Sequence, residues 1–378
     1  MGRPADGDDF LETRLTDVLE EVIASAGVPY ERQVYAEGRE NILAWTPADP
    51  HGKAAEKLLM LEAHQDTVPV EGMTISPFDP EIREGKLFGR GACDVKGGLA
   101  AMVTAFLRLA ADPRPDMPTV LLAATVDEEF GGGGAIHMRD RWREGAPHVP
   151  ERKPDVAVIA EPTSLNVVVA HKGALRWRLH TAGKAAHSSA PDKGDNAIYQ
   201  MQKVIAVLER YAKEIIPALG NHPLVGRPSL SVGVIDGGSS VNIVPDRCTI
   251  EVDRRLLPSE NPLDAFRHAV DFITAELPQD IQLTHEDPFT KSVGLNDDRN
   301  GDLAERLAAA VSQAGHRGDC IGVAFGTNAA RYASHGVPAV VFGPGSIDQA
   351  HTKDEWILVS QVDAAAEILV DFSRQVFV

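Results

Sequence analysis

Five short stretches of this chain place imidazole and carboxylate side chains where predicted strands run out into loops. They are His64-Gln65-Asp66, Gly91-Ala92-Cys93-Asp94, Asp127-Glu128-Glu129, Ala160-Glu161-Pro162 and Ala350-His351-Thr352. Together they supply two imidazoles and at least three carboxylates, which is the donor set of a two-metal site. Several carboxylates brought together without a cation would repel one another, and a divalent metal removes that penalty. The set therefore indicates metal-assisted hydrolysis.

The first stretch follows the apolar run from Lys57 to Ala63, which is suited to a buried parallel strand. A spacing of two on an extended chain puts His64 and Asp66 on one face. A metal-bound histidine usually donates its other ring N–H to a carboxylate, so His64 is the expected ligand and Asp66 its partner. The alternative is a pair of solvated residues at a strand end, because short motifs give false positives.

The second stretch is rich in glycine and leads into an apolar helix that begins near Leu99. A phosphate-binding loop is the rival interpretation. It fails because Gly89 and Gly91 lack a third glycine at the required offset, and no Gly-Lys-Ser/Thr follows. Asp94 fits better as a carboxylate that bridges two metal ions.

The third stretch ends a predicted strand from Thr119 to Val126 with consecutive acids. Acids are rarely buried unless they are paired or bind a metal, and neighbouring side chains at a strand end point in opposite directions. One glutamate of Glu128-Glu129 can therefore bind metal while the other faces the substrate. The alternative is a solvated acidic turn.

The fourth and fifth stretches also follow predicted strands. Glu161 ends another buried strand, and His351 follows a strand and a glycine turn between Val337 and Gly345.

These stretches, in this order, resemble the family that contains acetylornithine deacetylase, succinyl-diaminopimelate desuccinylase, aminoacylase and the glutamate-releasing carboxypeptidase. The resemblance extends from about His64 to Trp356. It implies two Zn²⁺ ions, with Co²⁺ or Mn²⁺ as substitutes. The implied assignments are His64 and Glu161 on one zinc, Glu129 and His351 on the other, Asp94 as the bridge, Glu128 as the general base and a cis peptide at Asp94-Val95. Asp66, as the partner of His64, is counted with the catalytic residues.

Further segments resemble the smaller lid domain of this family. The segment from Gly183 to Ser189 implies that His187 stabilises the oxyanion, and it implies a homodimer through the lid, in which His187 reaches the partner's site. Asn242 would lie near the substrate, although it could equally be a turn residue. Arg255, with Arg254 as the second choice, would hold a substrate carboxylate, which suits a bidentate guanidinium. Many relatives carry Asp where Asn328 stands, so the likeness transfers no single substrate.

The pattern of elements predicts an α/β fold in two domains. A mostly parallel-sheet zinc-hydrolase domain is expected from residues 1–173 and 287–378, beginning with an amphipathic helix from Phe10 to Ala24 whose apolar stripe includes Val18 and Val22. Residues 174–286 have the order βαββαβ of a ferredoxin-like module, inserted as a lid. Its elements are expected at the positions listed here: strand 175–181, helix 196–216, strands 229–235 and 248–255, helix 262–277 and strand 281–285.

Composition excludes several classes of function. The net charge of −18 argues against binding to nucleic acid or an anionic membrane. Cys93, Cys248 and Cys320 show no paired spacing, and Cys93 is expected to pack in the core, so a reducing, cytoplasmic location is expected. No apolar run reaches transmembrane length, and the acidic start of the chain lacks an apolar signal core.

The expected activity is therefore hydrolysis of the amide bond of an N-acyl amino acid. N-acetylornithine, which yields acetate and ornithine, is the first candidate. Succinyl-diaminopimelate and a dipeptide, cleaved by a metallo-carboxypeptidase or dipeptidase, are the alternatives, because one site type serves several substrates. A non-catalytic binding protein with the same fold is the hypothesis of a different class, and loss of the base or of a ligand would indicate it.

Overall fold

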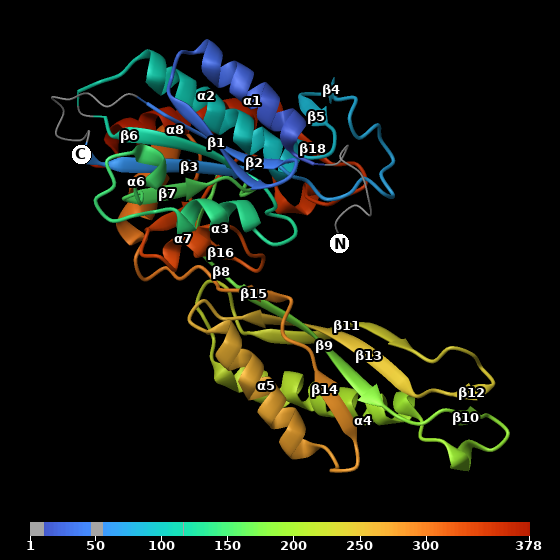
Figure 1. Cartoon of the computed structure of the whole chain (residues 1–378). Coiled ribbons are helices and arrows are strands. Elements are labelled where there is room, and N and C mark those ends of the chain that lie inside the picture. Colours follow the sequence, from blue (N-terminus) through green and yellow to red (C-terminus); the bar gives the residue numbers. More distant parts are fainter. Residues whose placement is uncertain (1–10, 47–55, 116) are drawn as a thin grey trace. The chain divides into compact units, whose positions relative to one another are not determined.

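The computed structural model describes residues 11–46, 56–115 and 117–378, and the chain forms two compact units (Figure 1). The first unit comprises Met1–Val169, Asp297–Ile321 and Thr327–Val378. The second comprises Ala170–Asn296 and Gly322–Gly326, so it is inserted into the sequence of the first. In the part of the chain that the structure describes, every helix is too short or too polar to span a lipid bilayer.

An eight-stranded sheet forms the centre of the first unit (Figure 1). In spatial order its strands are β1 (Tyr30–Ala36), β2 (Arg39–Trp45), β6 (Thr119–Thr125), β3 (Leu58–His64), β7 (Val156–Ile159), β17 (Ala339–Val341), β8 (Val167–His171) and β16 (Cys320–Val323). The run β6-β3-β7-β17 is parallel, whereas β1 and β2 form an antiparallel hairpin and β8 lies antiparallel to β17. The predicted parallel sheet is therefore confirmed at the centre, and its flanking strands are antiparallel.

Helices cover both faces of this sheet. One face packs against α1 (Thr13–Ser25), α2 (Gly97–Ala111), α6 (Gly301–Gln313) and α8 (Val359–Gln375), and α3 (Gly133–Asp140) and α7 (Ala329–Ala333) pack on the opposite face. All of β3 is buried, with Leu59 and Leu61 in the core under α2. Since side chains alternate along a strand, Glu62 and His64 belong to the face that carries α7.

The apolar stripe predicted for the first helix is partly wrong. Leu19 and Ile23 are buried, but Val18 and Val22 are exposed, because the helix turns its Thr16-Leu19-Ile23 side to the core. Phe10, where that helix was expected to begin, lies outside the described residues.

A second small sheet has the order β18 (Trp356–Leu358), β5 (Lys86–Phe88) and β4 (Glu81–Arg83). Asp94 lies beyond β5, in a kinked turn (Ala92–Lys96) that leads into α2. His351 follows β17 as predicted, after the glycine turn and a 3₁₀ turn, Ile347–Gln349.

The second unit has the predicted ferredoxin-like order (Figure 1). Its elements are β9 (Gly173–Ala182), α4 (Ala197–Arg210), β11 (Ser229–Gly237), β13 (Arg247–Leu256), α5 (Pro262–Glu276) and β14 (Gln282–His285). The antiparallel sheet runs β11-β13-β9-β14, and α4 and α5 enclose a core with Trp177 and Ile250. A further strand, β15 (Thr290–Ser292), pairs with β9, and β10 (Ala186–His187) pairs with β12 (Ile243–Val244).

Candidate metal centre

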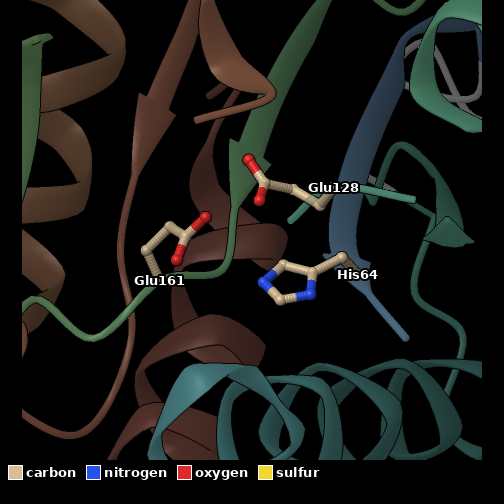
Figure 2. A group of neighbouring side chains, drawn as sticks. All are labelled: His64, Glu128 and Glu161. Carbon is tan, nitrogen blue, oxygen red and sulfur yellow. The ribbon is translucent and has the colours of Figure 1, made fainter. Parts of the chain in front are cut away.

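Three neighbouring parallel strands of the first unit bring ligand-type side chains to one edge of the sheet. His64 ends β3, Glu128 follows β6 and Glu161 follows β7. Figure 2 shows these side chains directed toward one another, and each offers an atom within 4.8 Å of the others. Because the carboxyl ends of parallel strands lie at one edge of the sheet, His64, Glu128 and Glu161 meet there although they are far apart in the sequence.

Asp94 lies between the two predicted histidine ligands. Its Oδ1 is 3.2 Å from His64 Nε2, and its Oδ2 is 3.3 Å from His351 Nε2. His351 Nε2 is also 3.1 Å from Glu129 Oε1. Ligand atoms at 2.0–2.1 Å from a tetrahedral zinc are separated by roughly 3.3 Å, so these spacings suit the metal. The donor set therefore fits two ions with Asp94 shared between them.

Asp66 supports more of the site than the sequence indicated. His64 Nδ1 lies 3.0 Å from the Asp66 carbonyl oxygen and 3.5 Å from the carboxylate oxygen Oδ1. The two carboxylate oxygens accept hydrogen bonds from the backbone N–H groups of Glu128 and Glu129, each at 3.0 Å. Asp66 thus orients the imidazole and also fixes the backbone that carries both glutamates.

The loop that carries Asp94 is held by Glu355, a residue for which the sequence analysis predicted no role. The fully buried carboxylate accepts hydrogen bonds from the backbone N–H groups of Gly91, Cys93 and Asp94 at 2.8–2.9 Å. It also pairs with Arg90 at 2.7 Å. The peptide bond after Asp94 is cis, which confirms that expectation, and the Cys93 thiol is buried, as predicted.

Among the protein groups alone, the charges of this site are unbalanced. Burial, together with the carboxylates of Glu129, Asp66 and Asp94, raises the pKa of Glu128 to about 8 against the effect of His64. Burial likewise raises the pKa of Glu161 and of Glu129. Hydrogen bonds to Asp94 and Glu129 raise the pKa of His351 to about 10. The three glutamates are therefore harder to ionise among the protein groups alone, and a bound divalent cation would favour their ionised forms.

Asn328 lies behind the site, on the face of β3 that carries α7. Its Nδ2 donates to Glu62 Oε1 at 3.0 Å, and its Oδ1 accepts from Arg331 Nε at 3.2 Å. Both Glu62 and Asn328 are buried, and burial raises the pKa of Glu62. Asn328 can serve as donor and acceptor at once, which an ionised aspartate cannot. The two hydrogen bonds to Glu62 and Arg331 therefore explain why this chain can carry Asn328 in place of a charged aspartate.

The second unit carries the predicted substrate-binding residues. His187 and Asn242 are exposed and adjacent, because β10 pairs with β12 and Ser188 N donates to Asn242 O at 3.0 Å. Arg255 lies on the open face of β13, with its Nε donating to Asp253 at 2.8 Å.

Arg254, the second choice for the carboxylate, points the other way and is buried. Its guanidinium donates to Ala265 O at 2.7 Å and to Glu260 at 2.6 Å, so its contacts are structural and it is not available to a substrate.

Known proteins are similar to this chain in sequence and in fold. Residues 60–375 match the family described as peptidase family M20/M25/M40. An acetylornithine deacetylase of Myxococcus xanthus is 29% identical over 94% of this chain and 90% of its own length. The aminopeptidase PepT of Bacillus cereus has a TM-score of 0.75 at 22% identity, over 97% of this chain and 93% of that structure. The Bacillus subtilis YXEP protein, a dinuclear metal binding peptidase, has a TM-score of 0.69 at 14% identity, with 97% and 93% covered.

Proposed function

This chain belongs to peptidase family M20/M25/M40, and we propose that it hydrolyses the amide bond of an N-acyl amino acid, with N-acetylornithine as substrate and acetate and ornithine as products. The observation that carries the reaction class is Asp94, whose two oxygens face His64 and His351 separately. The choice of substrate is supported by the deacetylase relatives, which match most of the chain.

In the proposed centre His64 and Glu161 would hold one zinc ion, Glu129 and His351 would hold the other, and Asp94 would be shared between them. Cobalt or manganese would substitute. When bound, the ions lower the pKa of water and polarise the amide carbonyl. The carboxylates with raised pKa values would lose their protons as the ions bind, because metal ligands must be deprotonated.

Glu128 is the proposed general base. Its carboxylate lies beside His64 and Glu161, as Figure 2 shows, and a carboxylate within reach of the attacking water can both accept and return a proton. It would take the proton of the attacking water and deliver it to the leaving amine. Asp66 would keep Glu128 in place through the backbone bond described above.

Three residues of the second unit are proposed to contact the substrate. His187 would donate a hydrogen bond to the developing oxyanion. Arg255 would bind the α-carboxylate, with a guanidinium that Asp253 already orients. Asn242, next to His187 on the paired strands, would bind the polar part of the substrate.

A panel of substrates tests the activity. N-acetylornithine, succinyl-diaminopimelate, other N-acyl amino acids and dipeptides would be assayed with zinc, cobalt and manganese. We expect the highest kcat/KM for N-acetylornithine. Faster cleavage of succinyl-diaminopimelate or of dipeptides would reassign the substrate, and binding of these compounds without turnover in the presence of each metal would support the non-catalytic binding protein.

We further propose a homodimer through the second unit. In that unit β11 is an edge strand, and the apolar side chains of Ile235 and Val241 are exposed, the latter fully. Val241 lines a surface hollow of this unit together with Tyr199 of α4, which is also exposed. Exposed edges and apolar patches of this kind are typical of association surfaces.

Subunit mixing tests whether His187 acts on the partner's site. Glu128→Ala and His187→Ala should each be nearly inactive alone. In a co-refolded mixture half of the dimers are mixed, and one site of each mixed dimer has both groups, so activity should return to roughly a quarter of wild type. A monomer in solution, or no recovery despite proven subunit exchange, would contradict the shared site.

A further inference from the structure

Three charged side chains are buried together behind the metal-ligand loops of the first unit. Arg39, at the start of β2, donates from Nε and Nη2 to both oxygens of Glu12 at 2.9 and 2.7 Å. Its Nη1 donates to the carboxylate of Asp127. The side chains of Glu12 and Asp127 are each 2% exposed and that of Arg39 is 12% exposed. One guanidinium therefore joins α1, β2 and the end of β6.

Asp127 adopts an unusual backbone conformation at this point. Its φ of 66° lies in the left-handed region, which costs a residue other than glycine roughly 1 kcal/mol, although aspartate and asparagine tolerate it best. Its N–H donates to Glu12 Oε1 at 3.3 Å, and its carbonyl accepts from Gly131 N at 3.1 Å. Glu12 and Arg39 thus hold the backbone and the side chain of the residue at which the turn after β6 begins.

The two residues that follow Asp127 are the proposed base and a proposed metal ligand. The backbone N–H groups of Glu128 and Glu129 are bonded to Asp66, which approaches from β3. This short run is consequently clamped from two directions, by Asp66 on one side and by Arg39 with Glu12 on the other. A change in the φ of Asp127 would rotate both glutamates away from His64 and His351.

We propose that Arg39, together with Glu12, is a positioning residue of the metal centre, which holds Asp127 in the left-handed conformation and thereby directs Glu128 and Glu129 toward the metal ions. This inference rests on the proposed metal-dependent function.

Stability alone is a poor reason for such a cluster. The cluster takes two carboxylates and one guanidinium out of water, and apolar side chains of similar size would often be as stable or more so. Burial and the charge of Asp66 raise the pKa of Glu12 against the effect of Arg39, so the ionised carboxylate is disfavoured at this position.

The chain offers a matched control in Arg32. This arginine also connects α1 with the β1-β2 hairpin, through Asp17 at 2.8 Å, Glu20 at 2.7 Å and Glu40. Its guanidinium donates hydrogen bonds to side chains of α1 and β2, which lie outside the run from Asp127 to Glu129. Removing it should weaken the same layer of the fold without altering the direction of the glutamates.

The test compares Arg39→Met with Arg32→Met in the full chain. Zinc affinity and stoichiometry would be measured by competition with a chromophoric chelator, and unfolding would be measured in excess chelator. Replacement of residues that orient metal ligands typically lowers metal affinity about 10–100-fold, and we expect that loss for Arg39→Met. Arg32→Met should bind zinc like wild type, even where its melting temperature falls as much. In Arg39→Met kcat should fall while KM changes little.

Asp127→Asn provides a second variant in case Arg39→Met does not fold. Asparagine tolerates the left-handed conformation but lacks the charge that pairs with Arg39, so a similar loss of zinc affinity is expected. If Asp127→Asn or Arg39→Met bound zinc as tightly as wild type, or if Arg32→Met lost as much zinc affinity, the inference would be overturned and the proposed function would stand. A wild-type protein that binds no divalent metal would overturn the proposed function and the inference with it.

Discussion

Replacing Glu355 by glutamine would test how far the metal centre depends on a side chain outside the ligand set. The variant keeps the size of the side chain and removes its charge. In the structure Glu355 Oε1 accepts from the backbone of Cys93 and Asp94, and Oε2 accepts from Gly91 N and Arg90. Glutamine can keep one oxygen toward the first pair, but its NH₂ group then faces the second pair, which are both donors.

Two hydrogen bonds to a buried charge are thereby lost. Each contributes about 1.5–3 kcal/mol, so the free energy of unfolding should fall by about 3–6 kcal/mol. For a unit of this size 1 kcal/mol corresponds to about 2–4 °C, which gives a drop in melting temperature on the order of 10 °C. Because the loop that carries Asp94 would lose its anchoring bonds at Arg90 and Gly91, zinc affinity should also fall about 10–100-fold.

Thermal unfolding in excess chelator would measure the first effect, since bound metal would otherwise add to the stability of the folded state. Glu367→Gln is the control, because Glu367 also pairs with an arginine, Arg108, at 2.6 Å but is exposed. Exposed pairs contribute about 1 kcal/mol or less. If Glu355→Gln unfolded within about 1 kcal/mol of that control, the reasoning on buried bonds would be refuted.

Four further outcomes are expected. Chelation should abolish hydrolysis and readdition of zinc, cobalt or manganese should restore it; full activity in the stripped protein would exclude a metal mechanism. Glu128→Gln should keep zinc and lose about 10²–10⁴-fold in kcat, whereas Glu129→Gln should lose zinc affinity, and reversed phenotypes would exchange their roles. Arg255→Lys should raise KM for substrates with a free α-carboxylate and leave amidated substrates unaffected; equal effects on both would remove Arg255 from the site. In chelator the melting temperature should fall as pH rises from about 5 to 10. The raised pKa values of Glu128 (about 8) and His351 (about 10) mean that the folded protein holds these protons more tightly than the unfolded chain, and this stabilisation is lost as pH rises to those values. Added zinc should reduce the dependence on pH, and a melting temperature that rises with pH would contradict the assignment.

The ligand stretches could be predicted from sequence because hydrophilic side chains end apolar runs, and parallel strands bring such ends together. Glu355 and Arg39 could not be found in this way. Glu355 bonds to residues more than 260 positions away, and Arg39 bonds to Asp127 88 positions away, so only the tertiary structure pairs them.

The choice between Arg254 and Arg255 had a usable signal. Side chains alternate along β13, and Arg254 is in phase with the buried Ile250 and Val252, which places it in the core. The exposure of Val18 and Val22 had no such signal. Val18 and Val22 are four residues apart, as are Leu19 and Ile23, so either pair could lie on the buried side of α1. In the structure the side with Leu19 and Ile23 packs against the sheet.

The position of Glu355 and His351 near the end of the chain has a consequence for biosynthesis. A ribosome releases the strands that carry His64, Glu128 and Glu161 long before it reaches these residues, since the whole second unit is translated in between. The nascent first unit therefore exposes three ligand-type side chains around an Asp94 loop that still lacks its anchor. The full set of proposed ligands becomes available only when translation has passed His351 and Glu355, so the inserted unit can fold before the proposed centre is complete.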